Sequence, residues 1–141
     1  MTPWELFLNS VGPIAFGGLV GTIPLALSSF ALGLVIALGV ALMRISTKRV
    51  VSGIARAYIS IIRGTPLLVQ LFVIFYGMPS IGITIDPWPS AIVAFSLNVG
   101  GYAAEVIRAA ILSVPKGQWE AAYTVGMGRT RTLTRVILPQ A

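Results

Sequence analysis

Uncharged, apolar stretches alternate with short charged ones along the chain and predict three membrane-spanning helices. No residue from Leu6 to Met43 is charged, and a helix over residues 23–43 would rise about 31 Å, close to the roughly 30 Å of a hydrocarbon core. Two further uncharged runs follow, at 64–85 and 87–104. Within a single domain, 1–141, we therefore predict spans at about 21–43, 64–82 and 88–113.

Polar residues and prolines mark the expected ends of these helices. Thr65 stands directly before Pro66 and is a candidate N-cap for the second span, since proline is tolerated in a first helical turn. Glu105 and Arg108 lie one turn apart and can form an ion pair, so the third helix can continue to about Ser113. Glycines before the first span predict flexible or interfacial backbone rather than a packing motif; they are Gly12, Gly17, Gly18 and Gly21.

A different pattern follows the third span, at 115–139. Apolar and small residues recur there at helical spacing from Trp119 to Gly126, which predicts a short amphipathic helix. Gly126 and Gly128 interrupt this helix, and a second helical pattern starts near Arg129, with an apolar face opposite a basic one. We therefore predict a bent pair of short helices in this segment.

Basic residues fall into two windows that predict the orientation in a membrane. Loops rich in Lys and Arg stay cytoplasmic, and the predicted crossings put both windows on the same side. We therefore expect the N-terminus and the loop at 78–90 outside and the segment at 115–139 in the cytoplasm. The net charge of +6 then requires no nucleic-acid partner. The windows are Arg44, Lys48, Arg49, Arg56 and Arg63, then Arg108, Lys116, Arg129, Arg131 and Arg135.

Composition supports an all-α integral membrane protein and argues against catalysis. The chain is 56% hydrophobic and only 10% charged, whereas soluble domains have roughly 25% charged residues. It contains no Cys and no His, which removes thiolate metal sites and the commonest general base. No phosphate-binding Gly-rich loop ending in Gly-Lys-Ser/Thr occurs. We expect no metal, no cofactor and no catalytic residues.

The C-terminal segment resembles the EAA loop of ABC importer permeases. The matching residues are Glu120, Ala121, Ala122, Gly126, Leu138 and Pro139, at the spacing of that loop. The stretches at 63–70, which begins Arg63-Gly64-Thr65-Pro66, and at 102–108 resemble signatures of the polar amino-acid branch. The Asp86-Pro87 loop and the run at 116–120 are similar to cystine-type members.

This resemblance implies a transport subunit and not an enzyme. It implies a five-helix permease fold in a bacterial inner membrane, of which three helices are present here, and a homo- or heterodimer of permeases. An extracytoplasmic protein would deliver a polar amino acid, and cystine is a candidate. A separate ATPase would hydrolyse ATP and hold the cytoplasmic EAA loop in a cleft. Since the family carries two more spans after this loop, we expect the chain to be truncated.

Alternatives remain for both the residues and the function. Arg63, Gly64, Thr65 and Pro66 are either gating residues or helix-start punctuation with a snorkelling cation. Glu105 and Arg108 are either a structural ion pair or gating residues. Residues that contact the substrate are not assigned. A small proton-coupled multidrug exporter is the main rival function, but it requires a carboxylate within a span. A structural membrane protein is another, and it leaves the EAA spacing unexplained.

Overall fold

Helices make up most of the molecule, and no strand occurs in residues 2–141, the part of the chain that the computed structural model describes. This confirms the predicted all-α fold. Two helices are long and apolar enough to cross a membrane, and a bent pair of shorter helices would provide a third crossing. The membrane limits at 21–43, 64–82 and 88–113 stay predictions.

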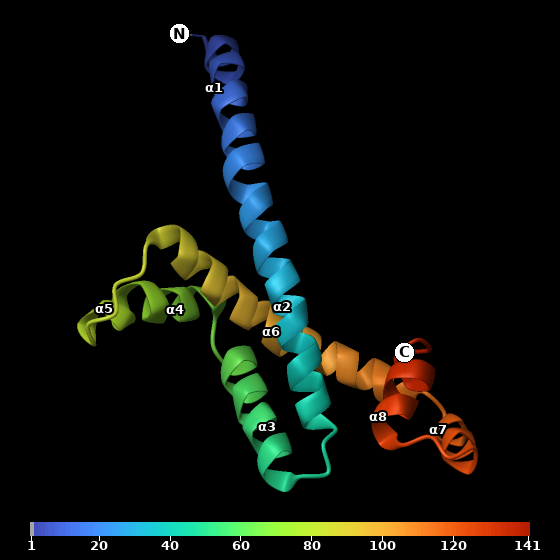
Figure 1. Cartoon of the computed structure of the whole chain (residues 1–141). Coiled ribbons are helices and arrows are strands. Elements are labelled where there is room, and N and C mark those ends of the chain that lie inside the picture. The colour runs from blue at the N-terminus through green and yellow to red at the C-terminus, as the bar shows by residue number, and fades with distance from the viewer. Residues whose placement is uncertain (1) are drawn as a thin grey trace.

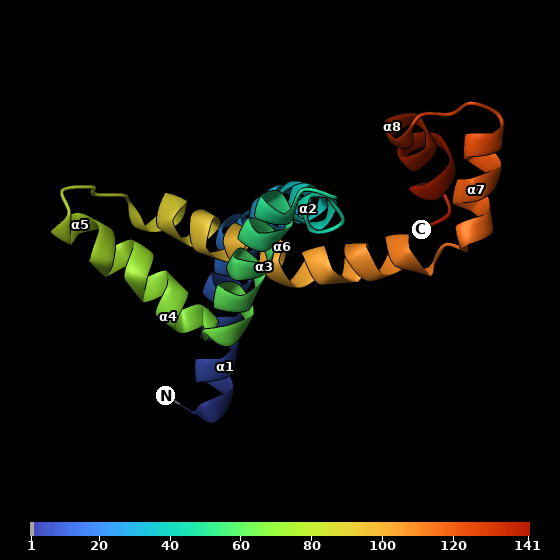
Figure 2. The same ribbon diagram turned by 90° about the horizontal axis from the view of Figure 1, so that it is seen from below.

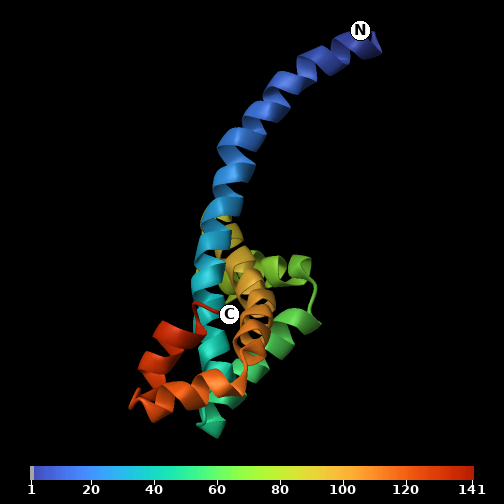
Figure 3. The ribbon, with the colours of Figure 1, turned by 90° about the vertical axis from the view of Figure 1, so that its right-hand side faces the viewer.

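A continuous helical rod forms the N-terminal part of the molecule. It consists of α1 (Pro3–Gly17), the π-helical segment η1 (Gly18–Thr22) and α2 (Ile23–Arg44). Its N-terminal end projects away from the other helices (Figures 1 and 3), and α1 buries no residue. The glycines predicted to lie in flexible backbone are therefore helical. Glycine costs only about 1 kcal/mol in a helix, less than an unpaired backbone group costs in lipid.

Helix α3 (Arg49–Gly64) runs back along α2 and is amphipathic. Figure 1 shows α3 beside the lower half of α2, joined to it by a short turn. Its buried residues Ala55, Ile59 and Ile62 are spaced by three or four positions and so share one face. That face lies against α2 and the long helix α6 (Pro87–Ser113).

The chain bends by 105° after α3. Thr65 is extended (φ −120°, ψ 139°) because the following Pro66 disfavours helical geometry at the residue before it. Three short helical segments continue from the bend: α4 (Leu67–Phe72), the π-helical η2 (Val73–Gly77) and α5 (Met78–Ser80). The second predicted span therefore begins at a bend, and its helix is shorter than the first and the third.

Close packing of glycines allows α6 to cross α2 and α3 (Figure 2). A Cβ atom built on Gly100 would lie 2.6 Å from the Ile36 side chain, and one on Gly33 would lie 2.6 Å from Val99. Such contacts are typical of helices that associate within membranes. Beneath the crossing, Ala37, Ile59 and Ala104 form a buried cluster. Glycine and alanine at these contacts therefore let the helices approach closely, and larger side chains such as Ile59 fill the space beside them.

Two short helices complete the described chain at the C-terminal end of α6. They are α7 (Lys116–Thr124) and α8 (Arg129–Thr132), and the π-helical segment η3 (Leu133–Ile137) continues α8. Figure 2 shows both helices gathered beside the end of α6, away from α4 and α5. The sequence pattern predicted this bent pair.

Candidate functional site

A sharp turn separates the candidate coupling segment, residues 115–139, from α6. Val114 is extended (φ −65°, ψ 126°) and Pro115 occupies the N-cap position of α7. Proline has no N–H to continue the hydrogen bonds of α6 and disfavours helical geometry at the residue before it. The helix that carries the coupling residues therefore starts anew, in a different direction from α6.

Gly126 closes α7 through a hydrogen-bonded C-terminal cap. The Met127 N–H donates to the Ala122 carbonyl and the Gly126 N–H donates to the Tyr123 carbonyl, each at 3.0 Å. This pair of bonds is the Schellman motif, and it needs a left-handed residue at the position that Gly126 occupies with φ +78°. The motif satisfies carbonyl groups that a helix end leaves free and turns the chain toward α8.

The inner side of the coupling segment is fastened to α6 and α2. Ile137 is fully buried, together with Ile111 and Val114 at the end of α6. The Arg129 Nη2 donates to the Ile45 carbonyl oxygen at 2.9 Å. Ile45 is the C-cap residue of α2, and the helix dipole favours a cation at that position. The partly buried residues around this cluster are Leu42, Ile45, Ile107, Trp119, Leu133, Val136 and Leu138.

The predicted EAA-loop residues divide between an outer and an inner side. Glu120 and Ala121 are exposed, whereas Ala122 is only 5% exposed. Leu138 is partly buried in the cluster above, while Pro139 is exposed after the last helical turn. The same segment thus combines an apolar attachment to the membrane helices with an outer edge available to another protein.

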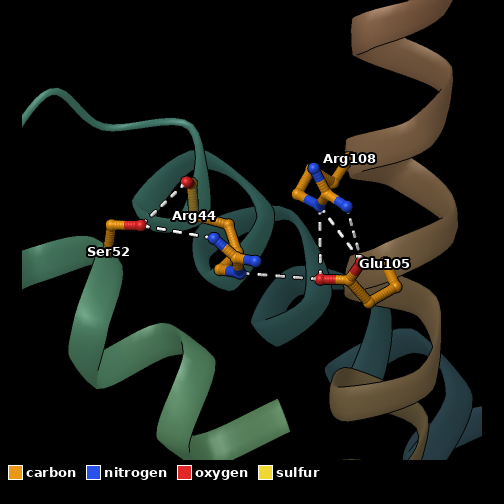
Figure 4. A network of polar contacts seen from close by, with 4 residues as sticks. All are labelled: Arg44, Ser52, Glu105 and Arg108. Atoms are coloured by element: carbon orange, nitrogen blue, oxygen red, sulfur yellow. Dashed lines mark hydrogen bonds and ion pairs between the residues drawn. The ribbon is translucent and has the colours of Figure 1, made fainter.

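A second group of polar side chains joins α2, α3 and α6 (Figure 4). The predicted pair of Glu105 and Arg108 is present, with Arg108 Nη2 3.0 Å from Glu105 Oε2. Arg44 reaches the same carboxylate from α2, with its Nε 3.7 Å from Glu105 Oε1. Arg44 Nη1 also donates to the Ser52 hydroxyl at 3.3 Å, and that hydroxyl donates to the Arg44 carbonyl. One carboxylate therefore serves two guanidinium groups, and sequence reasoning missed Arg44 and Ser52.

At the bend between α3 and α4, Thr65 does not act as the predicted N-cap. The N-cap position of α4 is Pro66, and no side chain caps that helix. The Thr65 hydroxyl instead donates back to the Ile61 carbonyl at 2.8 Å, and Thr65 is the C-cap residue of α3. Thr65 thus completes the end of α3, and Gly64 is its last residue.

Gln70 holds the same bend from the α4 side. Its Nε2 donates to the Ile62 carbonyl at 2.8 Å and to the Thr65 carbonyl at 3.0 Å, and Asn98 Nδ2 of α6 donates to its Oε1 at 3.2 Å. Its amide hydrogens thus reach carbonyls that the end of α3 leaves free. Sequence reasoning gave Gln70 no role; the signal was a polar side chain inside an apolar run, one turn after the bend.

Arg63 at the end of α3 stacks on α6. Its guanidinium lies 5.6 Å from the centroid of the Tyr102 ring, within the range of a cation–π contact. Arg63 therefore contacts the middle of α6, whereas the coupling segment packs on the end of that helix. The two predicted sets of residues form separate sites. In residues 2–141 no group of three His, Cys, Asp or Glu side chains is placed to hold a metal ion.

The chain is similar to permeases of amino-acid transport systems. It is 59% identical to the L-cystine transport system permease protein TcyB of Bacillus subtilis, over 99% of this chain and 59% of that protein. It is 44% identical to the octopine transport system permease protein OccM of Rhizobium radiobacter, over 89% of this chain and 57% of that protein. The chain thus spans about three fifths of the length of these relatives.

A solved structure and a family profile agree with these relatives. The crystal structure of an amino acid ABC transporter with histidines superposes with a TM-score of 0.85 at 37% identity, over 99% of this chain and 65% of that one. The profile described as binding-protein-dependent transport system inner membrane component matches residues 29–141. The resemblance indicated by the motifs is therefore confirmed: the chain belongs to the family of binding-protein-dependent transport system inner membrane components.

Proposed function

We propose that the chain forms part of the translocation path of an ATP-driven importer for polar amino acids, and that residues 115–139 dock to its ATPase. The main support for this proposal is the way in which the coupling segment is exposed on one side and packed on the other. Its outer edge exposes Glu120 and Ala121, while Ile137 is fully buried against α6. A helix with a free outer edge and a fixed inner side suits insertion into a partner's groove.

The attachment of the segment offers a route for motion. Movement of α7 by an ATPase would act on Ile111 and Val114 of α6 through the buried cluster, and on α2 through the Arg129 contact with Ile45. Close-packed interiors transmit displacement because they are not readily compressed. We infer that the two membrane helices respond together when the partner closes around ATP.

For the substrate, we propose a polar amino acid, with cystine favoured. The support is the relative TcyB, an L-cystine permease by name, and the cystine-type runs at 86–87 and 116–120. An extracytoplasmic binding protein would deliver the amino acid to a dimer of permeases. The N-terminus would face outward and the coupling segment the cytoplasm, as the distribution of cations favours.

A charge reversal at the outer edge tests the docking proposal. In the intact permease, Glu120→Arg places a cation where the ATPase cleft would receive a carboxylate, and we expect loss of ATPase assembly with normal membrane insertion. Glu5→Arg is the matched control, since Glu5 is also an exposed carboxylate near the start of a helix but lies on α1. Co-purification of the ATPase and ATP hydrolysis in proteoliposomes would be measured. Normal assembly with Glu120→Arg would contradict the proposal.

Substrate class is tested separately. In proteoliposomes with the cognate binding protein, we expect cystine to stimulate ATP hydrolysis more than neutral apolar amino acids do. Equal stimulation by an apolar amino acid would refute the substrate assignment and leave the docking proposal standing, because docking is read from assembly alone.

A further inference from the structure

A cavity of about 410 Å³ lies at the turn between α2 and α3. Its α3 side is formed by Arg49, Ser52, Gly53 and Arg56. Ser52 and Gly53 each lie three or four positions from both arginines, so the four residues share one helical face. Two residues of the connecting turn, Ser46 and Thr47, complete the lining. The volume falls within the usual range of sites for small ligands, roughly 300–1,000 Å³.

The cations of this cavity have no carboxylate partner in the described part of the chain. Every ion pair within 4 Å among residues 2–141 involves Glu105, paired with Arg44 and Arg108. Arg49 and Arg56 are therefore uncompensated. Guanidinium groups bind phosphate oxygens through several directed hydrogen bonds, so the cavity suits an anion with several acceptor oxygens.

The remaining lining leaves room for such an anion. A Cβ atom built on Gly53 would meet no atom within 4 Å, so the middle of this face is open. Ser52 is held in place by Arg44, whose Nη1 donates to its hydroxyl. The Ser46 hydroxyl accepts the Lys48 N–H at 3.3 Å, which leaves its own hydrogen free to turn toward a ligand.

An apolar stripe on α3 runs beside the cationic face. Val50, Ile54 and Ile61 share this stripe and are 75%, 59% and 64% exposed. Helix α3 therefore has three faces: one buried against α2 and α6, one cationic and one exposed and apolar. The cavity also lies next to Arg44, the last residue of the apolar helix α2. A ligand that uses both free faces has an anionic head and an apolar tail.

We propose that this cavity binds the headgroup phosphate of an anionic phospholipid between Arg49 and Arg56, with an acyl chain along Val50, Ile54 and Ile61. Basic pockets beside membrane helices recognise lipid headgroups in this way. The proposal rests on membership of a membrane family and not on transport of any amino acid. Free phosphate offers the same head chemistry but makes no use of the apolar stripe.

Native mass spectrometry of the intact permease in detergent tests the site, with phosphatidylglycerol, phosphatidylcholine of the same acyl chains and inorganic phosphate added in separate titrations. We expect a phosphatidylglycerol adduct that exceeds the other two. In Arg49→Gln/Arg56→Gln its dissociation constant should rise roughly 30-fold, since each cation contributes about 1 kcal/mol toward an anionic surface. The matched control is Arg131→Gln/Arg135→Gln, two exposed cations outside the cavity, which should bind as the unchanged protein does.

A second variant tests the cavity without changing its charge. Gly53→Leu fills the open middle of the face and suits a helix better than glycine does, so the fold should persist while phosphatidylglycerol binding falls several-fold. Equal losses in both double variants would show a diffuse charge effect and overturn the proposal. So would equal binding of inorganic phosphate or phosphatidylcholine, or unchanged lipid binding in Gly53→Leu.

Discussion

At position 126 the backbone conformation, and not the surrounding space, requires glycine. Gly126 has φ +78°, whereas Gly128 has φ −72°, and a Cβ atom would meet nothing within 4 Å at either. Left-handed geometry costs roughly 1–2 kcal/mol for other residues. We therefore expect Gly126→Ala to loosen the end of α7 by about 1 kcal/mol and Gly128→Ala to leave it unchanged. Hydrogen exchange of the amides at 122–127 measures the effect, and equal exchange in the two variants would refute it.

Glu105 is the only carboxylate shared by two cations in the described chain, and its removal should cost stability. Glu105→Gln leaves Arg44 and Arg108 without an anionic partner; their side chains are 18% and 29% exposed. Hydrogen bonds to charged groups contribute about 1.5–3 kcal/mol, and partial exposure reduces this. We expect a loss of about 1–2 kcal/mol, measured as a lower melting temperature in detergent. Glu120→Gln, at an exposed carboxylate, is the control, and equal melting temperatures would contradict this expectation.

Local residue pairs were predictable from the sequence, and contacts between helices were not. The spacing of three between Glu105 and Arg108 determines their pairing on one helix. Arg44 joins them across a crossing whose geometry depends on glycine contacts, such as Gly100 against Ile36. Thr65 failed as an N-cap because α4 begins one residue later than expected, with Pro66 at its N-cap position, and the Thr65 hydroxyl donates to the Ile61 carbonyl of α3 instead.

At the scale of the helices, the crossing of α6 over α2 and α3 depends on close approaches at glycines, and Gly100 is one of them. A Cβ atom on Gly100 would lie 2.6 Å from Ile36 Cγ2 and 2.8 Å from the Tyr58 hydroxyl oxygen, which itself donates to the Leu97 carbonyl. Overpacking of this kind costs typically 1–3 kcal/mol. We expect Gly100→Ala to lower the melting temperature.

Gly39→Ala on α2 is the matched control for this prediction, since a Cβ atom there meets nothing within 4 Å. Alanine suits a helix better than glycine does, so the control should be neutral or slightly stabilising. If both variants melted at the same temperature, the close approach at Gly100 would not support the crossing.

Among the elements, the sequence predicted long apolar helices better than the amphipathic one between them. Residues 49–63 carry cations and lay outside the predicted spans, yet they form nearly all of α3. The helical spacing of Ala55, Ile59 and Ile62 indicates this helix in the sequence. A prediction based only on uncharged runs does not take that spacing into account. The bend was visible as Pro66, but its 105° angle is held by Gln70 hydrogen bonds that involve both α3 and α6.

Over the whole molecule, the balance of buried and exposed surface fits a lipid environment. Helix α1 buries nothing, and its large apolar side chains are exposed, among them Phe7, Ile14 and Phe16. In water this surface would be costly, at roughly 25 cal/mol per Å² of apolar area, whereas lipid accepts it. Composition alone predicted the membrane class for this reason, but it carried no information on which helices would touch.

The distribution of cations makes a prediction about the whole molecule that single cysteines can test, since the chain contains no native cysteine. Three exposed threonines mark three regions of the chain: Thr47 in the turn between α2 and α3, Thr84 in the loop before α6 and Thr130 in α8. Each is replaced by cysteine, a change of similar size. Because Lys and Arg flank Thr47 and Thr130 but not Thr84, a membrane-impermeant maleimide added to intact cells should label only Thr84→Cys. Permeabilised cells, the control for access, should label all three. Labelling of Thr130→Cys from outside would place the coupling segment on the wrong side for any ATPase.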